Sequence, residues 1–137
     1  MKKIALGIVL LALCIPVLAA DIPNMIGNWT GSFESVGYLK NTNWMYTGNA
    51  SYWTDNNTIM IQEQNGTRFV GKIIPAENPK QVETVIGVIS SDNESLSLVD
   101  EDELLWGWMI SPTKMDLSFQ NVDMDSMAAG SGIFTKQ

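Results

Sequence analysis

The densest group of chemically reactive side chains in this sequence is a run of four carboxylates at residues 100–103. Carboxylate oxygens suit Ca²⁺, and a turn could bring two or three of them together. The run lacks the Asp-x-Asp-x-Asp-Gly spacing of a calcium-binding loop, however, and so does the acidic segment that contains Asp123 and Asp125. We therefore interpret both segments as solvated turns and predict no metal site.

The residue types that are missing exclude most catalytic devices. The 137 residues include no histidine, which excludes a Ser-His-Asp triad and an imidazole metal ligand. The only cysteine, Cys14, leaves no intrachain disulfide and no zinc–thiolate site. Acid–base chemistry by paired carboxylates requires two groups that face each other across a cleft, and nothing in the sequence places Glu34, Glu63 or Glu83 in that way.

From these absences we expect a protein that is not an enzyme and uses no cofactor. The alternative is an enzyme that works through carboxylates alone. A cavity holding a buried acidic side chain with a raised pKa would favour that alternative.

Aromatic residues are the second chemically informative group. Trp106 and Trp108 are two residues apart and share one face of a strand, but Leu105 and Met109 make the opposite face apolar as well. An aromatic-walled cavity would suit a small hydrophobic or aromatic ligand, whereas large side chains can also fill a narrow barrel completely. The predicted ligand-binding residues are Trp44, Tyr46, Trp53, Trp106 and Trp108.

Residues 1–20 have the three-part pattern of a secretory signal peptide. A basic start (residues 1–3) precedes the apolar run 4–13, and the segment ends in small residues at Ala19 and Ala20. The apolar run is shorter than the ~20 residues of a membrane span, so we expect no transmembrane segment. A lipoprotein signal at Cys14 is the alternative. We predict export to a secreted or extracytoplasmic location, at the cell surface or in the periplasm.

Residues 21–137 form the predicted mature domain. They carry six Lys and Arg against fifteen Asp and Glu, a net charge of −9, and contain no cysteine. Such an acidic protein repels nucleic acid, so we expect no nucleic-acid partner. Sequons of the Asn-x-Ser/Thr type predict a glycoprotein, although these residue types also share turns. The candidate glycosylation sites are Asn28, Asn49, Asn56, Asn65 and Asn93.

The mature chain is predicted to be all-β. Runs rich in β-branched and aromatic residues alternate with turn signals, and no segment shows a sustained helical apolar repeat. Asn65-Gly66 between runs 58–64 and 67–74 predicts a hairpin. The other expected strands are 26–35, 82–90, 94–99, 104–111, 114–120 and 127–136, with one or two weaker ones between 36 and 53. This pattern predicts a single antiparallel up-and-down β-barrel of about eight strands, with polar outer faces that argue against a lipid-facing barrel.

Two short motifs mark the ends of this meander. Gly27-Asn28-Trp29 opens the first strand, and residues 130–136 close the last with Phe134-Thr135-Lys136. Together with the hairpins between them, this order resembles the calycin families, the lipocalins and the avidin-like proteins. The segments 61–71, 87–93 and 98–102 also resemble small exported lipocalin-like proteins of methanogenic archaea.

The resemblance to calycins implies that Trp29 plugs the base of the barrel and that Lys136 covers its indole ring. An ammonium group over an indole face contributes ~0.5–2 kcal/mol. The polar set that binds biotin in avidins has no clear counterpart, and the absence of histidine argues against haem-binding relatives.

We therefore predict an exported, non-enzymatic barrel that holds a small hydrophobic or aromatic ligand in a Trp-lined interior. The alternative is a glycosylated cell-surface structural or adhesive module, with a solid barrel and exposed aromatic side chains near residues 44–53.

Overall fold

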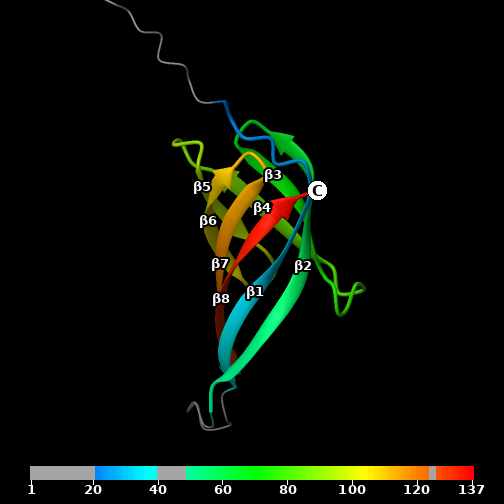
Figure 1. Cartoon of the computed structure of the whole chain (residues 1–137), viewed down its shortest axis with the longest axis vertical. Coiled ribbons are helices and arrows are strands. Elements are labelled where there is room, and N and C mark those ends of the chain that lie inside the picture. Colours follow the sequence, from blue (N-terminus) through cyan, green and yellow to red (C-terminus); the bar gives the residue numbers. More distant parts are fainter. Residues whose placement is uncertain (1–20, 40–48, 124–125) are drawn as a thin grey trace, which may run out of the picture.

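In the computed structural model, which describes residues 21–39, 49–123 and 126–137, the chain forms one closed barrel of eight antiparallel strands (Figure 1). Each strand pairs with the next one, and the last strand pairs with the first. The strands are β1 (Gly27–Leu39), β2 (Ser51–Asn65), β3 (Arg68–Pro75), β4 (Glu83–Ile89), β5 (Ser95–Val99), β6 (Leu104–Ser111), β7 (Lys114–Val122) and β8 (Ser126–Lys136). The predicted all-β up-and-down barrel is confirmed.

Two strands are longer than the sequence indicates. β1 continues beyond Ser35 to Leu39, and β2 is a single strand of 15 residues that begins at Ser51. Within the range 36–53, where one or two weaker strands are expected, residues 36–39 belong to the end of β1 and residues 51–53 to the start of β2. In Figure 1 the long strands β1 and β2 reach the lower end of the barrel, where β8 also begins and pairs with the end of β1. The predicted signal peptide (1–20) and residues 40–48 lie outside the described residues.

The β2–β3 hairpin is present, but its turn is shifted by one residue from the expected Asn65-Gly66. Asn65 pairs with Arg68, so the loop consists of Gly66 and Thr67. Gly66 has a φ of 61°, a left-handed conformation that costs glycine little, whereas Asn65 keeps strand geometry. A single positive φ, at the glycine, is enough to reverse the chain here.

Every strand contributes at least one buried side chain to the core of the barrel. On β7, Met115, Leu117 and Phe119 are buried, as the alternating pattern predicts. The interior is packed so tightly that position 87 has no room for a side chain and is occupied by glycine. A Cβ atom at that position would lie 2.3 Å from Cζ of Phe69. The described residues contain no helix long and apolar enough to cross a lipid bilayer.

The segment before β1 covers one end of the barrel, at which β1 begins and β8 ends. The backbone N–H of Met25 donates a hydrogen bond to Gln64 Oε1 (2.7 Å), and Gln64 Nε2 donates to the carbonyl oxygen of Pro23 (2.8 Å). Trp29 is fully buried beneath this segment, and its Nε1–H donates to the carbonyl oxygen of Met25 (2.8 Å). We call this the closed end.

Candidate ligand-binding site at the open end of the barrel

A cavity of about 320 Å³ lies at the opposite end of the barrel, where β3 and β5 end and β4 and β6 begin. Three kinds of side chain line it. They are the apolar residues Phe33, Ile73, Pro75 and Phe119, the amides Asn56, Asn57, Asn78 and Gln81, and the carboxylates Asp55, Glu77, Glu83, Asp100 and Glu103. The structural or adhesive alternative requires a solid barrel. The barrel has this space at one end, so it is not solid along its whole length. We call this space the mouth cavity.

Two phenylalanine rings form the apolar part of the mouth cavity. Phe33 and Phe119 meet edge to face, with ring centroids 5.0 Å apart and planes at 74°. Phe33 also contacts Phe134, with ring centroids 4.9 Å apart, and Phe134 is fully buried in the barrel interior. Because all three rings belong to the tightly packed core, the mouth cavity is a blind recess rather than a channel toward the closed end.

The acidic run forms the turn between β5 and β6 at the edge of this cavity. Asp100 Oδ1 accepts hydrogen bonds from the backbone N–H groups of Asp102 (3.2 Å) and Glu103 (2.8 Å). Asp100 Oδ2 is buried and has no hydrogen-bond partner among the described residues. The expectation of a fully solvated turn is wrong in part. Glu101 and Asp102 are exposed, but the turn holds Asp100 and Glu103 partly buried against the cavity.

Burial of these carboxylates changes their acidity. Desolvation, with the neighbouring charges of Asp100, Asp102, Glu83 and Asp55, raises the pKa of Glu103 to about 7. Desolvation also raises the pKa of Glu83 and of Asp100. Among the described residues no Lys or Arg lines the cavity. The mouth cavity thus gathers negative charge without a basic partner.

Three of these carboxylates lie close enough together to share a cation. One oxygen each from Glu83, Asp100 and Asp102 falls within 4.8 Å of the others. Ca²⁺ takes roughly six to eight oxygen ligands, so water would have to complete the shell around such an ion. We predicted no metal site because the acidic run lacks the spacing of a calcium-binding loop, and the spacing along the chain also does not show that Glu83 lies beside Asp100 and Asp102.

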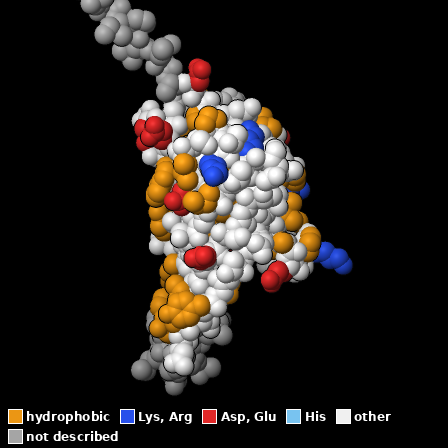
Figure 2. Space-filling model, in the orientation of Figure 1, with side chains coloured by type: hydrophobic (Ala, Val, Ile, Leu, Met, Phe, Trp, Pro, Cys, Tyr) orange, Lys and Arg blue, Asp and Glu red, His pale blue; other side chains and the backbone are white. Residues whose placement is uncertain are grey.

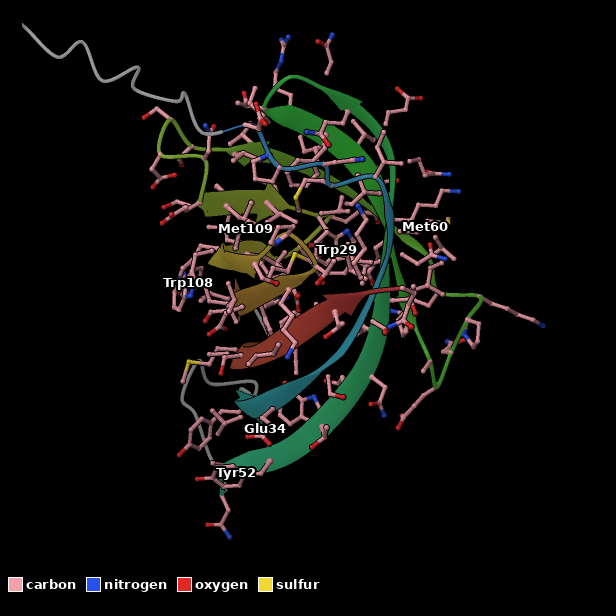
Figure 3. The ribbon with its side chains drawn as sticks, turned by 45° about the horizontal axis from the view of Figure 1, so that its top comes forward. Trp29, Glu34, Tyr52, Met60, Trp108 and Met109 are labelled. Atoms are coloured by element: carbon pink, nitrogen blue, oxygen red, sulfur yellow. The ribbon has the colours of Figure 1, made fainter. Side chains whose placement is uncertain are left out.

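The structure corrects the placement of Trp106 and Trp108. Their side chains are 43% and 50% exposed. Leu105, which precedes Trp106, and Gly107, which lies between the two tryptophans, are buried. In Figure 3, Trp108 points away from the barrel and Trp29 lies inside it. The two tryptophans therefore do not form the expected inner wall, because the pairing of Leu105 with Leu98 and Phe119 sets the opposite face inward.

Trp106 and Trp108 instead belong to an apolar outer face of the barrel. Part of this face is a row of four outward-facing residues, one on each strand from β3 to β6. Each residue pairs with the one on the next strand, and each side chain is at least 41% exposed. The row consists of Val70, Ile86, Val99 and Leu104. Figure 2 shows hydrophobic side chains gathered along the side of the barrel that carries β5 and β6. The predicted polar outer face holds for β7 but not here.

Of the other predicted ligand-binding residues, the structure describes Trp53, near the start of β2. Trp53 is 37% exposed, and its Nε1–H donates a hydrogen bond to the carboxylate of Asp55, which lines the mouth cavity. Its ring occupies the space over Gly37, where a Cβ atom would lie 2.7 Å from Cη2 of Trp53. Tyr52 is 80% exposed, as expected for this segment. Trp44 and Tyr46 lie outside the described residues.

The candidate glycosylation sites are accessible to different extents. Asn28, Asn49, Asn56 and Asn65 are exposed, and Asn93 is partly buried. The side-chain oxygen of Asn56 accepts a hydrogen bond from Ser32 Oγ (2.6 Å). Glycosylation of these sites stays a prediction.

Sequence reasoning missed the phenylalanines and the Glu103 carboxyl that shape the cavity. Phe33 follows Trp29 by four residues on the same strand, so the inward position of Trp29 already places Phe33 inside. Glu103 directly precedes β6 and faces β4 only because β4, β5 and β6 are neighbours in the sheet.

Comparisons with known proteins bear on the fold. No protein-family model matches the chain, and none of the curated proteins matches it. Among solved structures, one described as "EF1p2_mFAP2b bound to DFHBI" is similar over 82% of this chain and 93% of that chain, with a TM-score of 0.50 and 11% sequence identity. At this level of identity the similarity concerns the fold alone. No match to a protein family supports the resemblance to archaeal lipocalin-like proteins.

Proposed function

We propose that this protein is an exported, non-enzymatic barrel that binds a small molecule with an apolar or aromatic part in the mouth cavity. The observation that carries the proposal is a recess of about 320 Å³ at one end of a barrel whose other end is closed. Ligand cavities usually span roughly 300–1,000 Å³, so the recess suits a small ligand. The rings of Phe33 and Phe119 replace the tryptophan wall expected from the sequence.

A titration monitored by NMR tests whether the recess binds a ligand. Benzyl alcohol, a neutral aromatic probe, is added to the protein while backbone amide shifts are recorded. We expect saturable shifts centred on Phe33, Ile73 and Phe119. Asn57→Trp, which places a large ring in the cavity, should abolish them, and Gln62→Trp on an exposed position of β2 should not. Binding that survives Asn57→Trp, or no saturable binding of any probe, would contradict the proposal.

Export is proposed from residues 1–20 and has its own test. Intact mass and N-terminal sequencing of the protein recovered from its native host should give a chain that begins near Asp21. A chain that retains Met1–Lys3 would overturn this part of the proposal and leave the ligand site unaffected.

One observation favours a second candidate function, acid–base catalysis. Glu103 combines partial burial, a place in a cavity and a pKa raised to about 7, which are the properties of a catalytic proton donor. Turnover of a panel of nitrophenyl glycosides and esters would test it. Activity that Glu103→Gln removes, and that Glu101→Gln in the same turn preserves, would favour the enzyme over the binding protein.

A further inference from the structure

The chemistry of the mouth cavity also indicates which class of ligand it takes, an inference that rests on the proposed function. We propose that the mouth cavity selects organic cations: small amines whose ammonium group sits among Glu83, Asp100 and Glu103 and whose apolar or aryl part contacts Phe33 and Phe119.

The charge of the lining is the first argument. Five of the thirteen residues around the cavity are carboxylates, and none of the described ones is basic. Like charges held together in a partly desolvated space are unfavourable, and a positive charge placed among them relieves that repulsion. The lining therefore disfavours anionic ligands and favours cationic ones.

An unsatisfied acceptor is the second argument. Asp100 Oδ1 is occupied by two backbone N–H groups, while Asp100 Oδ2 is buried without a donor among the described residues. A buried acceptor without a partner is unfavourable, and a charge-assisted hydrogen bond is stronger than a neutral one. An ammonium group supplies N–H donors and positive charge to that oxygen at the same time.

The arrangement of polar and apolar side chains is the third argument. The edge-to-face pair of Phe33 and Phe119 is almost fully buried in the core, whereas the turn that carries Asp100 and Glu103 lies at the end of the barrel. A ligand that fits both must be apolar at one end and positively charged at the other. Neutral apolar molecules would leave the carboxylates without a partner.

Calorimetric titration with a matched pair of probes tests the inference. Benzylamine, which is protonated at pH 8, is compared at that pH with benzyl alcohol in buffer containing EDTA. We expect benzylamine to bind at least about tenfold more tightly, the effect of one charge-assisted hydrogen bond.

Variants locate the effect. The double change Glu83→Gln and Glu103→Gln, which leaves Asp100 in place, should reduce the preference for benzylamine, and Glu63→Gln on an exposed position of β2 should leave it unchanged. Thermal unfolding of each variant confirms that the barrel has formed. If the two probes bind equally and Asn57→Trp abolishes both, the inference is wrong and the proposed function stands. If neither probe binds the wild-type protein, both are wrong.

Discussion

Lys136 on the last strand lies with its Nζ 5.4 Å from the centroid of the Trp29 ring on the first strand. The two residues are direct partners in the β1–β8 register. Nζ also donates a hydrogen bond to the carbonyl oxygen of Asn24 (2.7 Å), in the segment that covers the closed end. One side chain thus joins β8, β1 and the covering segment, the arrangement that the resemblance to calycins implies.

Loss of this ammonium group should destabilise the barrel. We expect Lys136→Met to lower the free energy of unfolding by about 1 kcal/mol, because the cation–π contact and the hydrogen bond to Asn24 are both lost. Urea denaturation measures the change. Lys114→Met, at an exposed position of β7, is the matched control. An equal effect of both substitutions would show that the contact is unimportant.

Trp29 and Trp108 should respond differently to the same substitution. Trp29→Phe leaves the buried carbonyl of Met25 without its donor and creates a void, which together cost about 2–3 kcal/mol. Trp108→Phe, on the outer face, should change stability by no more than about 0.5 kcal/mol. Chemical denaturation of the two variants gives the comparison. A larger effect at Trp108 would contradict the inward and outward placement of these rings.

Acidification should stabilise the protein between about pH 7.5 and 5. The folded state raises the pKa of Glu103 from 4.5 to about 7, so it binds that proton more tightly than the unfolded chain does. The free energy of unfolding therefore rises as the pH falls through 7 and levels off below 4.5. The pKa values of Glu83 and Asp100 are also raised, so these groups contribute in the same direction. The pKa of Asp92 is lowered to about 2, and this group affects stability only at a pH below this range.

Glu103→Gln should reduce that pH dependence and raise stability at pH 8 by about 1 kcal/mol, after allowance for solvent screening. Glu101→Gln, in the same turn but exposed, should leave the dependence intact. Urea denaturation at several pH values measures both. A wild-type protein that loses stability on going from pH 7.5 to 5 would refute the assignment.

Backbone strain should decide the outcome of substitutions at Gly66. Nothing lies within 4 Å of a Cβ atom built there, so the positive φ of 61° is the only obstacle. We expect Gly66→Ala to cost about 1–2 kcal/mol, and Gly66→Asn to cost less because asparagine tolerates this conformation. Thermal denaturation compares the two variants. An equal loss of stability in the two variants would mean that the positive φ is not what makes glycine favourable at this position.

Most strands could be predicted because one face of each is apolar and the other is not. β7 is the clearest case, with Met115, Leu117 and Phe119 inward between polar residues. β6 could not be oriented, because Leu105 and Trp106 make both faces apolar, and only pairing with β5 and β7 decides between them. The first part of β2 has no apolar pattern of its own and is held by its pairing with β1, including the bond between Ser32 and Asn56.

The candidate site was harder to predict than the fold. Its carboxylates Asp55, Glu83 and Glu103 come from three separate parts of the chain. Their proximity follows from the closure of the sheet and from the common end at which β2, β4 and β6 begin. Composition indicated a surplus of acidic residues, but only the barrel geometry brings several of them to one rim.

The seam between β1 and β8 also constrains how this protein folds. Trp29 must find Lys136, a partner more than a hundred positions away, and β1 has no second neighbour until residues 126–136 are available. The other seven strand pairings join consecutive strands, so this seam carries the largest entropy cost of loop closure in the barrel. A nascent chain that lacks these last residues therefore presents two unpaired sheet edges, on β1 and β7.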